Sequence, residues 1–213
     1  MRNRRTRILE GLTGGSFRLS SDDKAFLRDL AKVRLISEDD ADATHFAQRK
    51  TKASKRLDKL VEQGLLSRKE ITIPGKGVVK AYTFGSEDVA KSLGSKLPKV
   101  NRMRNAYHEL IVSRLYFAEG RPASFKIEAE FTNSDIESIR QEGQSISEVA
   151  RPDALFTNAQ GQVVVVEADS GQYNSTQIKE KINSWKGFPQ VWGQPEQRKS
   201  AVENFSSAKV HRF

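Results

Sequence analysis

Two strand-like, largely apolar runs joined by a short polar turn, residues 154–157 and 162–168, are the feature that most constrains how this chain can fold. The four residues between them have the composition of a hairpin turn. Asp153 and Glu167 are equally distant from position 160, inside the turn, so the folded hairpin places them opposite each other on neighbouring strands. Side chains two apart on a strand share a face, so Asp169 projects to the same side as Glu167. The sequence therefore predicts that three carboxylates converge.

Three acidic side chains gathered on an apolar sheet repel one another and cost stability unless a cation neutralises them. Ligand sets made only of carboxylate oxygens favour Mg²⁺ or Mn²⁺ over zinc. A divalent ion held by Asp153, Glu167 and Asp169 could polarise a phosphoryl oxygen and activate a water, which is the chemistry of phosphodiester cleavage. The alternative is that the segment only ends a strand in solvent, with Ser170 and Gly171 turning the chain.

A helix with a lysine is predicted directly after this hairpin. Lys181 borders its apolar stripe more closely than Lys179 does, so the Lys181 ammonium can reach toward the carboxylates and hold a phosphate there. Both lysines could equally be solvated, and the pattern alone does not choose between these interpretations. The helix is expected to begin at about Ser175, and its apolar stripe consists of Ile178, Ile182 and Trp185.

The positive charge of the chain is concentrated in its first half. Residues 1–99 carry 22 Lys and Arg against 13 Asp and Glu, whereas residues 100–213 carry 14 of each, so the first half accounts for the whole net charge of +9. A basic excess of this kind drives attraction to phosphates. We therefore expect the first half to bind a polyanion; the alternative is a soluble domain that is merely rich in lysine.

Three helices are predicted in this basic half. Ser21 is expected to cap the first, over residues 22–33, and Ser37 with Asp40 to begin a short second one. The third, over residues 50–63, has Leu57, Leu60 and Val61 on one side, basic residues on the other, and Gly64 at its end.

A hairpin follows the third helix, because two β-rich runs flank the turn at residues 74–77. Three helices and a basic hairpin are typical of a winged helix-turn-helix, whose third helix enters the major groove while the wing lies on the backbone. A three-helix domain with solvated lysines is the alternative. The side chains expected on DNA are Lys50, Lys52, Lys55, Arg56 and Lys59 on the helix and Lys76 and Lys80 on the wing.

The organisation expected is a basic N-terminal arm (residues 1–20), a DNA-binding domain (21–97) and a second domain (103–213), with the boundary between Gly94 and Met103. In the second domain a helix is expected over residues 104–118 and an alternating strand over 125–131. A lone histidine on a helix usually packs or forms a structural hydrogen bond, so His108 is not assigned to the site.

The order of these acidic motifs resembles the restriction-endonuclease-like nucleases of the PD-(D/E)xK group. Pro152, Asp153 and Glu167 match their pattern, whereas Asp169 stands where that group has lysine. The resemblance implies an α+β chain in which the winged helix-turn-helix precedes a restriction-endonuclease-like α/β/α domain with a mixed central sheet.

A second resemblance accounts for the aspartate. A winged helix, then P-D-A, a hydrophobic strand ending in E-x-D-x-G and a helix with a lysine is similar to the replication-relaxation family and the MobC-type relaxases of mobilisable plasmids, over about residues 27–185. In that family Asp153, Glu167 and Asp169 match three metal-binding acids. The resemblance implies a metal-dependent nickase acting at an origin of transfer, with DNA and relaxosome accessory or coupling proteins as partners.

Other classes are excluded or left open by composition. The chain has no run of about eighteen apolar residues for a membrane span, no hydrophobic signal-peptide core and no cysteine, so a cytoplasmic protein without membrane insertion is expected.

Tyr173 is the tyrosine nearest the acids, but a tyrosine beside a strand end usually only packs. Two functions compete with a nickase: a non-catalytic DNA-binding regulator or relaxosome accessory protein, and a dimeric endonuclease that cuts both strands.

Overall fold

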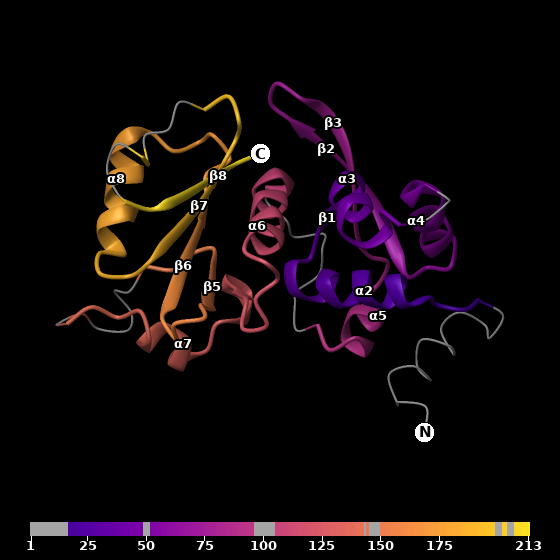
Figure 1. Ribbon diagram of the computed structural model, residues 1–213, viewed down its shortest axis with the longest axis horizontal. Coiled ribbons are helices and arrows are strands. Elements are labelled where there is room, and N and C mark those ends of the chain that lie inside the picture. Colours follow the sequence, from indigo (N-terminus) through magenta and orange to yellow (C-terminus); the bar gives the residue numbers. More distant parts are fainter. Residues whose placement is uncertain are drawn as a thin grey trace. The chain divides into compact units, whose positions relative to one another are not determined.

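The computed structural model describes residues 17–48, 52–95, 105–142, 144, 150–198, 202–203 and 207–213. The chain divides into two compact units, Met1–Ala106 and Tyr107–Phe213 (Figure 1). Most of the expected boundary at residues 94–103 lies outside the described residues. Both units combine helices with a β-sheet, which confirms the expected mixture of α and β structure.

Helix α2, Ser21–Val33, opens the first unit and is capped one residue earlier than the sequence predicts. The cap is Ser20, not Ser21, because Ser20 Oγ accepts from the Asp23 backbone N–H (3.2 Å) and the Asp23 carboxylate accepts from the Ser20 N–H (2.6 Å). This reciprocal capping box needs a side-chain acceptor three residues after the cap, and Asp23 stands at that distance from Ser20.

The second helical segment is capped by Ser37, as predicted. Ser37 Oγ accepts from the Asp40 N–H (3.1 Å) at the start of α3, Glu38–Ala41. One turn of π-helix, η1 (Asp42–Phe46), continues α3. A two-residue strand, β1 (Ile36–Ser37), precedes it, so the segment supplies both a strand and a short helix.

Helix α4, Ala53–Glu62, is the third helix and ends as predicted. Gly64 follows with φ of 69°, a left-handed conformation that glycine adopts without strain at a helix end. Leu57 and Leu60 are fully buried, as predicted. Lys50, expected in the first turn, lies outside the described residues.

The predicted basic hairpin is formed by β2 (Leu66–Ile73) and β3 (Gly77–Phe84). These strands pair antiparallel around the turn at residues 74–76, and β1 adds to β3, giving the sheet order β1-β3-β2. Helix α5, Glu87–Ser92, follows the hairpin. The helix order and the hairpin therefore agree with the sequence expectation for this unit.

The second unit contains a five-stranded mixed sheet in the order β4-β5-β6-β7-β8. Strands β4, β5 and β6 are antiparallel neighbours, whereas β6, β7 and β8 run parallel. The strands are β4 (Lys126–Ile127), β5 (Ala154–Thr157), β6 (Val163–Ala168), β7 (Gln190–Gln194) and β8 (Lys209–Arg212).

Helices α6 and α8 cover opposite faces of this sheet. Gly193 of β7 lies against α6, since a Cβ added to it would stand 2.5 Å from Ile111 Cγ2. Its neighbour Trp192 is buried with Ile178 and Ile182 of α8 on the other face. Neighbouring residues of a strand point to opposite faces, which explains this division. The helices of the unit are α6 (Ala106–Ala118), α7 (Asn133–Glu137) and α8 (Ser175–Ser184).

The prediction of a strand over residues 125–131 is wrong for the second half of that segment. β4 covers only Lys126–Ile127, and the chain then turns into a 3-10 helix at Glu128–Glu130. The partner strand explains the early end: β4 pairs with β5 only as far as Ala154, and Pro152 just before β5 has no N–H to extend the ladder.

Candidate functional site

The β5–β6 hairpin has the predicted register. Asn158 Oδ1 accepts from the backbone N–H groups of Gln160 (3.0 Å) and Gln162 (2.9 Å), which fixes the turn. The paired residues of β5 and β6 run from Thr157 opposite Val163 to Ala154 opposite Val166, and just before β5 the Asp153 backbone N–H donates to the Val166 carbonyl oxygen (3.1 Å). The short-range turn chemistry therefore sets the predicted register and brings Asp153 and Glu167 to the same end of the hairpin.

Asp153 is held by a backbone group and by a histidine. Its Oδ2 accepts from the Ala168 N–H (2.7 Å) and lies 3.1 Å from His108 Nε2 of α6. Burial alone would raise the pKa of Asp153, but the hydrogen bond and charge of His108 outweigh it and lower that pKa. Burial likewise opposes protonation of His108, yet Asp153 raises the histidine pKa above its ordinary value. The two groups therefore favour an aspartate–imidazolium pair.

Glu167 is fully buried and accepts hydrogen bonds from two side chains, one on α8 and one directly after that helix. Lys181 Nζ lies 2.5 Å from Glu167 Oε2, and Trp185 Nε1 donates to Oε1 at 2.8 Å. Burial and the negative charge of Asp153 raise the pKa of Glu167 to about 8, although Lys181 and Trp185 act in the opposite direction. The two carboxylates thus interact electrostatically, as like charges in a shared buried site do.

Lys181 lies at the position that the helical stripe predicts. Burial would lower its pKa, but the charges of Glu167 and Asp153 raise it, so the ammonium stays protonated. Its Nζ is 5.2 Å from the centre of the Tyr173 ring, and burial raises the pKa of that phenol. Lys179 is exposed on the same helix. The structure therefore separates the two lysines that the sequence left undecided.

Asp169 also lies fully buried near the end of β6, but its partners are different ones. Arg198 Nε lies 2.7 Å from Asp169 Oδ2, the Gly171 N–H donates to Oδ1 (2.9 Å), and Gln194 Nε2 approaches Oδ2 at 3.4 Å. Arg198 also donates to the Tyr173 carbonyl oxygen. The guanidinium thus ties the strand end to the loop that leads into α8.

The fit of these acids to a hard divalent ion differs from one acid to the next. Within the described part of the chain, no group of three or more histidine, cysteine, aspartate or glutamate side chains is arranged to hold a metal ion. Asp153 and Glu167 offer oxygen ligands of the type that Mg²⁺ and Mn²⁺ prefer, and they are close enough for the charge of Asp153 to raise the pKa of Glu167. Both oxygens of Asp169, like both oxygens of Glu167, are already bonded to protein donors, so either acid would have to exchange a protein donor for the ion.

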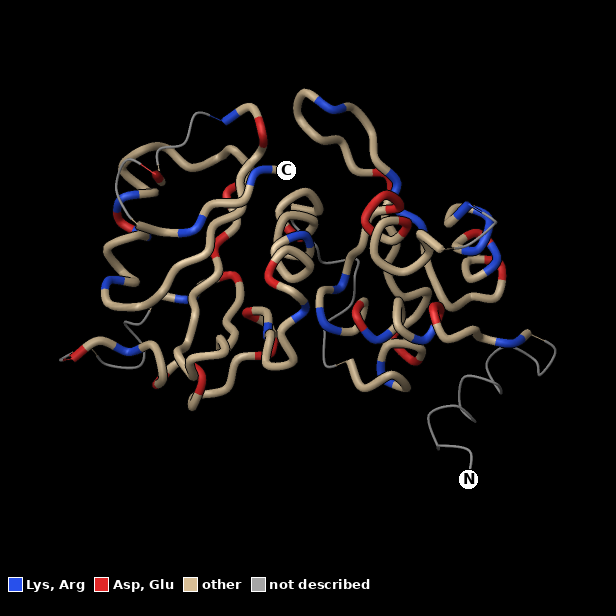
Figure 2. The backbone as a smooth tube through the Cα atoms, viewed as in Figure 1, with Lys and Arg blue, Asp and Glu red and all other residues tan. Residues whose placement is uncertain are grey.

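The basic residues of the first unit are mostly exposed. Lys52, Lys55 and Lys59 lie in solvent on one side of α4, and Figure 2 shows the basic residues of that helix and of the β2–β3 turn. On the hairpin, Lys76 is exposed in the turn and Lys80 is exposed opposite Glu70. Arg56 instead forms an ion pair with Asp23 (2.5 Å).

Sequence reasoning missed three residues that contact the acids. His108 was set aside because one histidine on a helix carries no spacing signal. Trp185 was assigned to packing alone, although its indole also bonds Glu167. Arg198 follows β7 in a polar segment with no recognisable motif, so its pairing with Asp169 becomes visible only in three dimensions.

No protein-family model, curated protein or solved structure matches this chain. Among the helices of the described residues, none combines the length and the apolar character needed to cross a membrane. Support for a function therefore comes from the contacts of the side chains themselves.

Proposed function

We propose that this chain is a metal-dependent DNA endonuclease of the relaxase type, which nicks one strand at an origin of transfer. The observation that carries the proposal is that Asp153 and Glu167 lie at the same end of the β5–β6 hairpin and interact electrostatically, with Lys181 2.5 Å from Glu167. Two carboxylates and a lysine in one partly buried site suit phosphodiester cleavage, since the acids attract a cation and the ammonium attracts a phosphate.

Asp153 and Glu167 are the residues that would hold Mg²⁺ or Mn²⁺, which when bound supplies Lewis-acid polarisation of a phosphoryl oxygen. His108 keeps Asp153 ionised and oriented, because its Nε2 lies 3.1 Å from Asp153 Oδ2. Trp185 fixes the other acid through the bond to Glu167 Oε1. Lys181 would hold a non-bridging oxygen of the scissile phosphate. Asp169 matches a metal ligand of the family that this chain resembles, but it would bind the metal only if its ion pair with Arg198 opened.

The first unit would bind the duplex. Its three helical segments and the β2–β3 hairpin support a winged helix-turn-helix, with α4 in the major groove and the hairpin as the wing. The second unit orders its main elements as α6, β4, α7, β5, β6, α8, β7 and β8, with three antiparallel strands and then two strands parallel to β6, which supports a restriction-endonuclease-like domain. A relaxosome and a coupling protein in the cytoplasm would be its partners.

A non-catalytic DNA-binding protein is the second candidate, and one observation favours it. Each of the three acids has its own cationic neighbour: His108 beside Asp153, Lys181 beside Glu167 and Arg198 beside Asp169. A purely structural role would explain such ion pairs, since a buried acid is tolerated when a cation neutralises it. This candidate would bind DNA and leave it uncut.

Incubation with supercoiled plasmids, with and without the cognate transfer origin, tests the proposal over a titration of Mn²⁺. The wild-type chain should convert the origin plasmid to open circles, and Asp153→Asn should bind the same DNA without nicking it. Linear product would indicate double-strand cleavage instead. Binding without any cleavage by the wild-type chain would leave the non-catalytic candidate.

A further inference from the structure

Arg56 of α4 holds the segment that precedes α2. Its Nε donates to Asp23 Oδ1 (2.9 Å) and its Nη2 to Asp23 Oδ2 (2.5 Å), a two-bond pair. The same Nη2 donates to the Arg18 carbonyl oxygen (3.0 Å), and the guanidinium carbon lies 4.5 Å from the centre of the Phe17 ring. We call these contacts of Phe17, Arg18 and Asp23 with Arg56 the arm clasp.

The arm clasp is a charged and largely buried structure. Asp23 is fully buried and the Arg56 side chain is 17% exposed. Burial would raise the pKa of Asp23, but the bonds from Arg56 and Ser20 lower it, so the carboxylate stays ionised. A guanidinium bonded to a buried carboxylate and a carbonyl has few donors left for a phosphate. Arg56 therefore acts within the protein rather than toward DNA.

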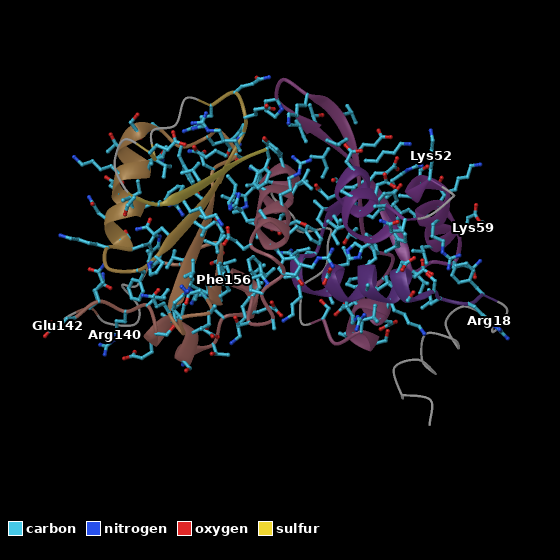
Figure 3. All side chains as sticks on the ribbon, viewed as in Figure 1. Arg18, Lys52, Lys59, Arg140, Glu142 and Phe156 are labelled. Atoms are coloured by element: carbon cyan, nitrogen blue, oxygen red, sulfur yellow. The ribbon has the colours of Figure 1, made fainter. Side chains whose placement is uncertain are left out.

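The clasp leaves the Arg18 side chain in solvent beside α4. Arg18 is exposed, although its carbonyl is fixed by Arg56. Lys52, Lys55 and Lys59 are exposed on α4 itself, and Figure 3 shows Arg18, Lys52 and Lys59 on the same side of the first unit. Fixing the backbone at Arg18 reduces the backbone conformational freedom that this segment would lose on binding an anion.

We propose that Arg18 is a further phosphate-contacting residue of the first unit and that Arg56 positions it through the arm clasp. Arg18 would bind the sugar-phosphate backbone of a DNA duplex beside the segment touched by α4. The inference rests on the proposed DNA-binding function of this unit. It assigns the phosphate contact that was expected of Arg56 to Arg18, which was not among the residues expected on DNA.

Fluorescence anisotropy with a labelled DNA duplex, measured over a range of salt concentrations, tests this inference. Arg18→Ala should reduce the slope of log K against log salt by about 0.9, the value for one lost phosphate contact, and weaken binding roughly five- to ten-fold at low salt. Lys91→Ala is the matched control, since Lys91 is 64% exposed on α5 and pairs with Glu87. It should leave the slope unchanged.

The positioning role is tested by a double-mutant cycle, because removing Phe17 loosens the clasp without leaving Asp23 unpaired. Arg18→Ala should cost much less in a Phe17→Ala background than in the wild type. Equal costs in both backgrounds would overturn the role of the clasp, and Arg18→Ala binding like Lys91→Ala would overturn the phosphate contact.

The triple variant Lys52→Ala, Lys55→Ala, Lys59→Ala separates this inference from the proposed function. If the triple variant binds weakly and Arg18→Ala binds normally, only the Arg18 inference fails. If Arg18→Ala is weak and the triple variant is normal, the inference stands and the role of α4 fails. If both bind normally, both fail.

Discussion

The guanidinium of Arg198 lies 2.7 Å from the carboxylate of Asp169, and the Asp169 side chain is fully buried. Removing one partner of a buried ion pair leaves an uncompensated charge. We therefore expect Arg198→Ala to lower the free energy of unfolding by about 3–5 kcal/mol, measured by urea denaturation.

The matched control is Arg212→Ala, which removes the exposed pair of Arg212 with Glu203 (2.9 Å, 43% and 50% exposed). Exposed pairs contribute about 1 kcal/mol or less. Equal effects of the two arginine substitutions would show that the Asp169 pair does not hold the strand end.

Lys181 and Lys179 provide a test of the site within one helix. Lys181→Ala removes the ammonium that lies 2.5 Å from Glu167, so nicking should fall on the order of 100-fold, as it does when one transition-state donor is lost. Lys179→Ala should leave the nicking rate near that of the wild type, because Lys179 is exposed. Parallel losses in both variants would count against Lys181 as a phosphate ligand.

The raised pKa of Glu167 makes stability depend on pH. Its value rises from 4.5 in ordinary surroundings to about 8, so between these values the folded protein keeps a proton that the unfolded chain releases. The free energy of unfolding should therefore fall as pH rises from about 4.5 to 8. The raised pKa of His108 adds to this fall above its ordinary value of 6.5, so the interval from 4.5 to 6.5 isolates Glu167.

Denaturation in EDTA across that interval should show a fall of about 2 kcal/mol in the wild type. Glu167→Gln should flatten the curve, whereas Glu137→Gln, at an exposed site paired with Arg140, should keep it. A wild-type curve that rises from pH 4.5 to 6.5 would contradict the raised pKa.

Gly193 tests the packing of α6 on the sheet that carries the acids. A Cβ at this position would lie 2.5 Å from Ile111 Cγ2 and 2.9 Å from Leu115 Cδ1. Gly193→Ala should therefore cost about 1–3 kcal/mol of unfolding free energy. Thr157→Ala, at an exposed strand end, should change it by about 0.5 kcal/mol or less. A neutral Gly193→Ala would show that α6 packs less closely than described.

The sequence predicted features that depend on local chemistry. The β5–β6 register followed from the turn at residues 158–161, since a short loop leaves few ways to pair the strands. The position of Lys181 followed from helical periodicity, and the end of α4 followed from Gly64.

Features that depend on distant partners could not be predicted. Nothing near Asp169 in the sequence indicates that Arg198, 29 positions later, would bond it. Arg56 is spaced along α4 like the lysines expected to contact DNA, yet it forms an ion pair with Asp23 of another helix. The strand expected over residues 125–131 follows its own alternation but ends early, because its partner strand begins after a proline.

The measurement that tests the central claim most directly is calorimetric titration of Mn²⁺ into the EDTA-treated protein. We expect one Mn²⁺ per chain in the wild type, a loss of affinity of at least about ten-fold in Asp153→Asn and in Glu167→Gln, and little change in Asp169→Asn. Far-UV circular dichroism should show that all three variants are folded. Unchanged Mn²⁺ affinity in Glu167→Gln, or no binding to the wild-type chain, would contradict the claim that Asp153 and Glu167 form a metal-dependent active site.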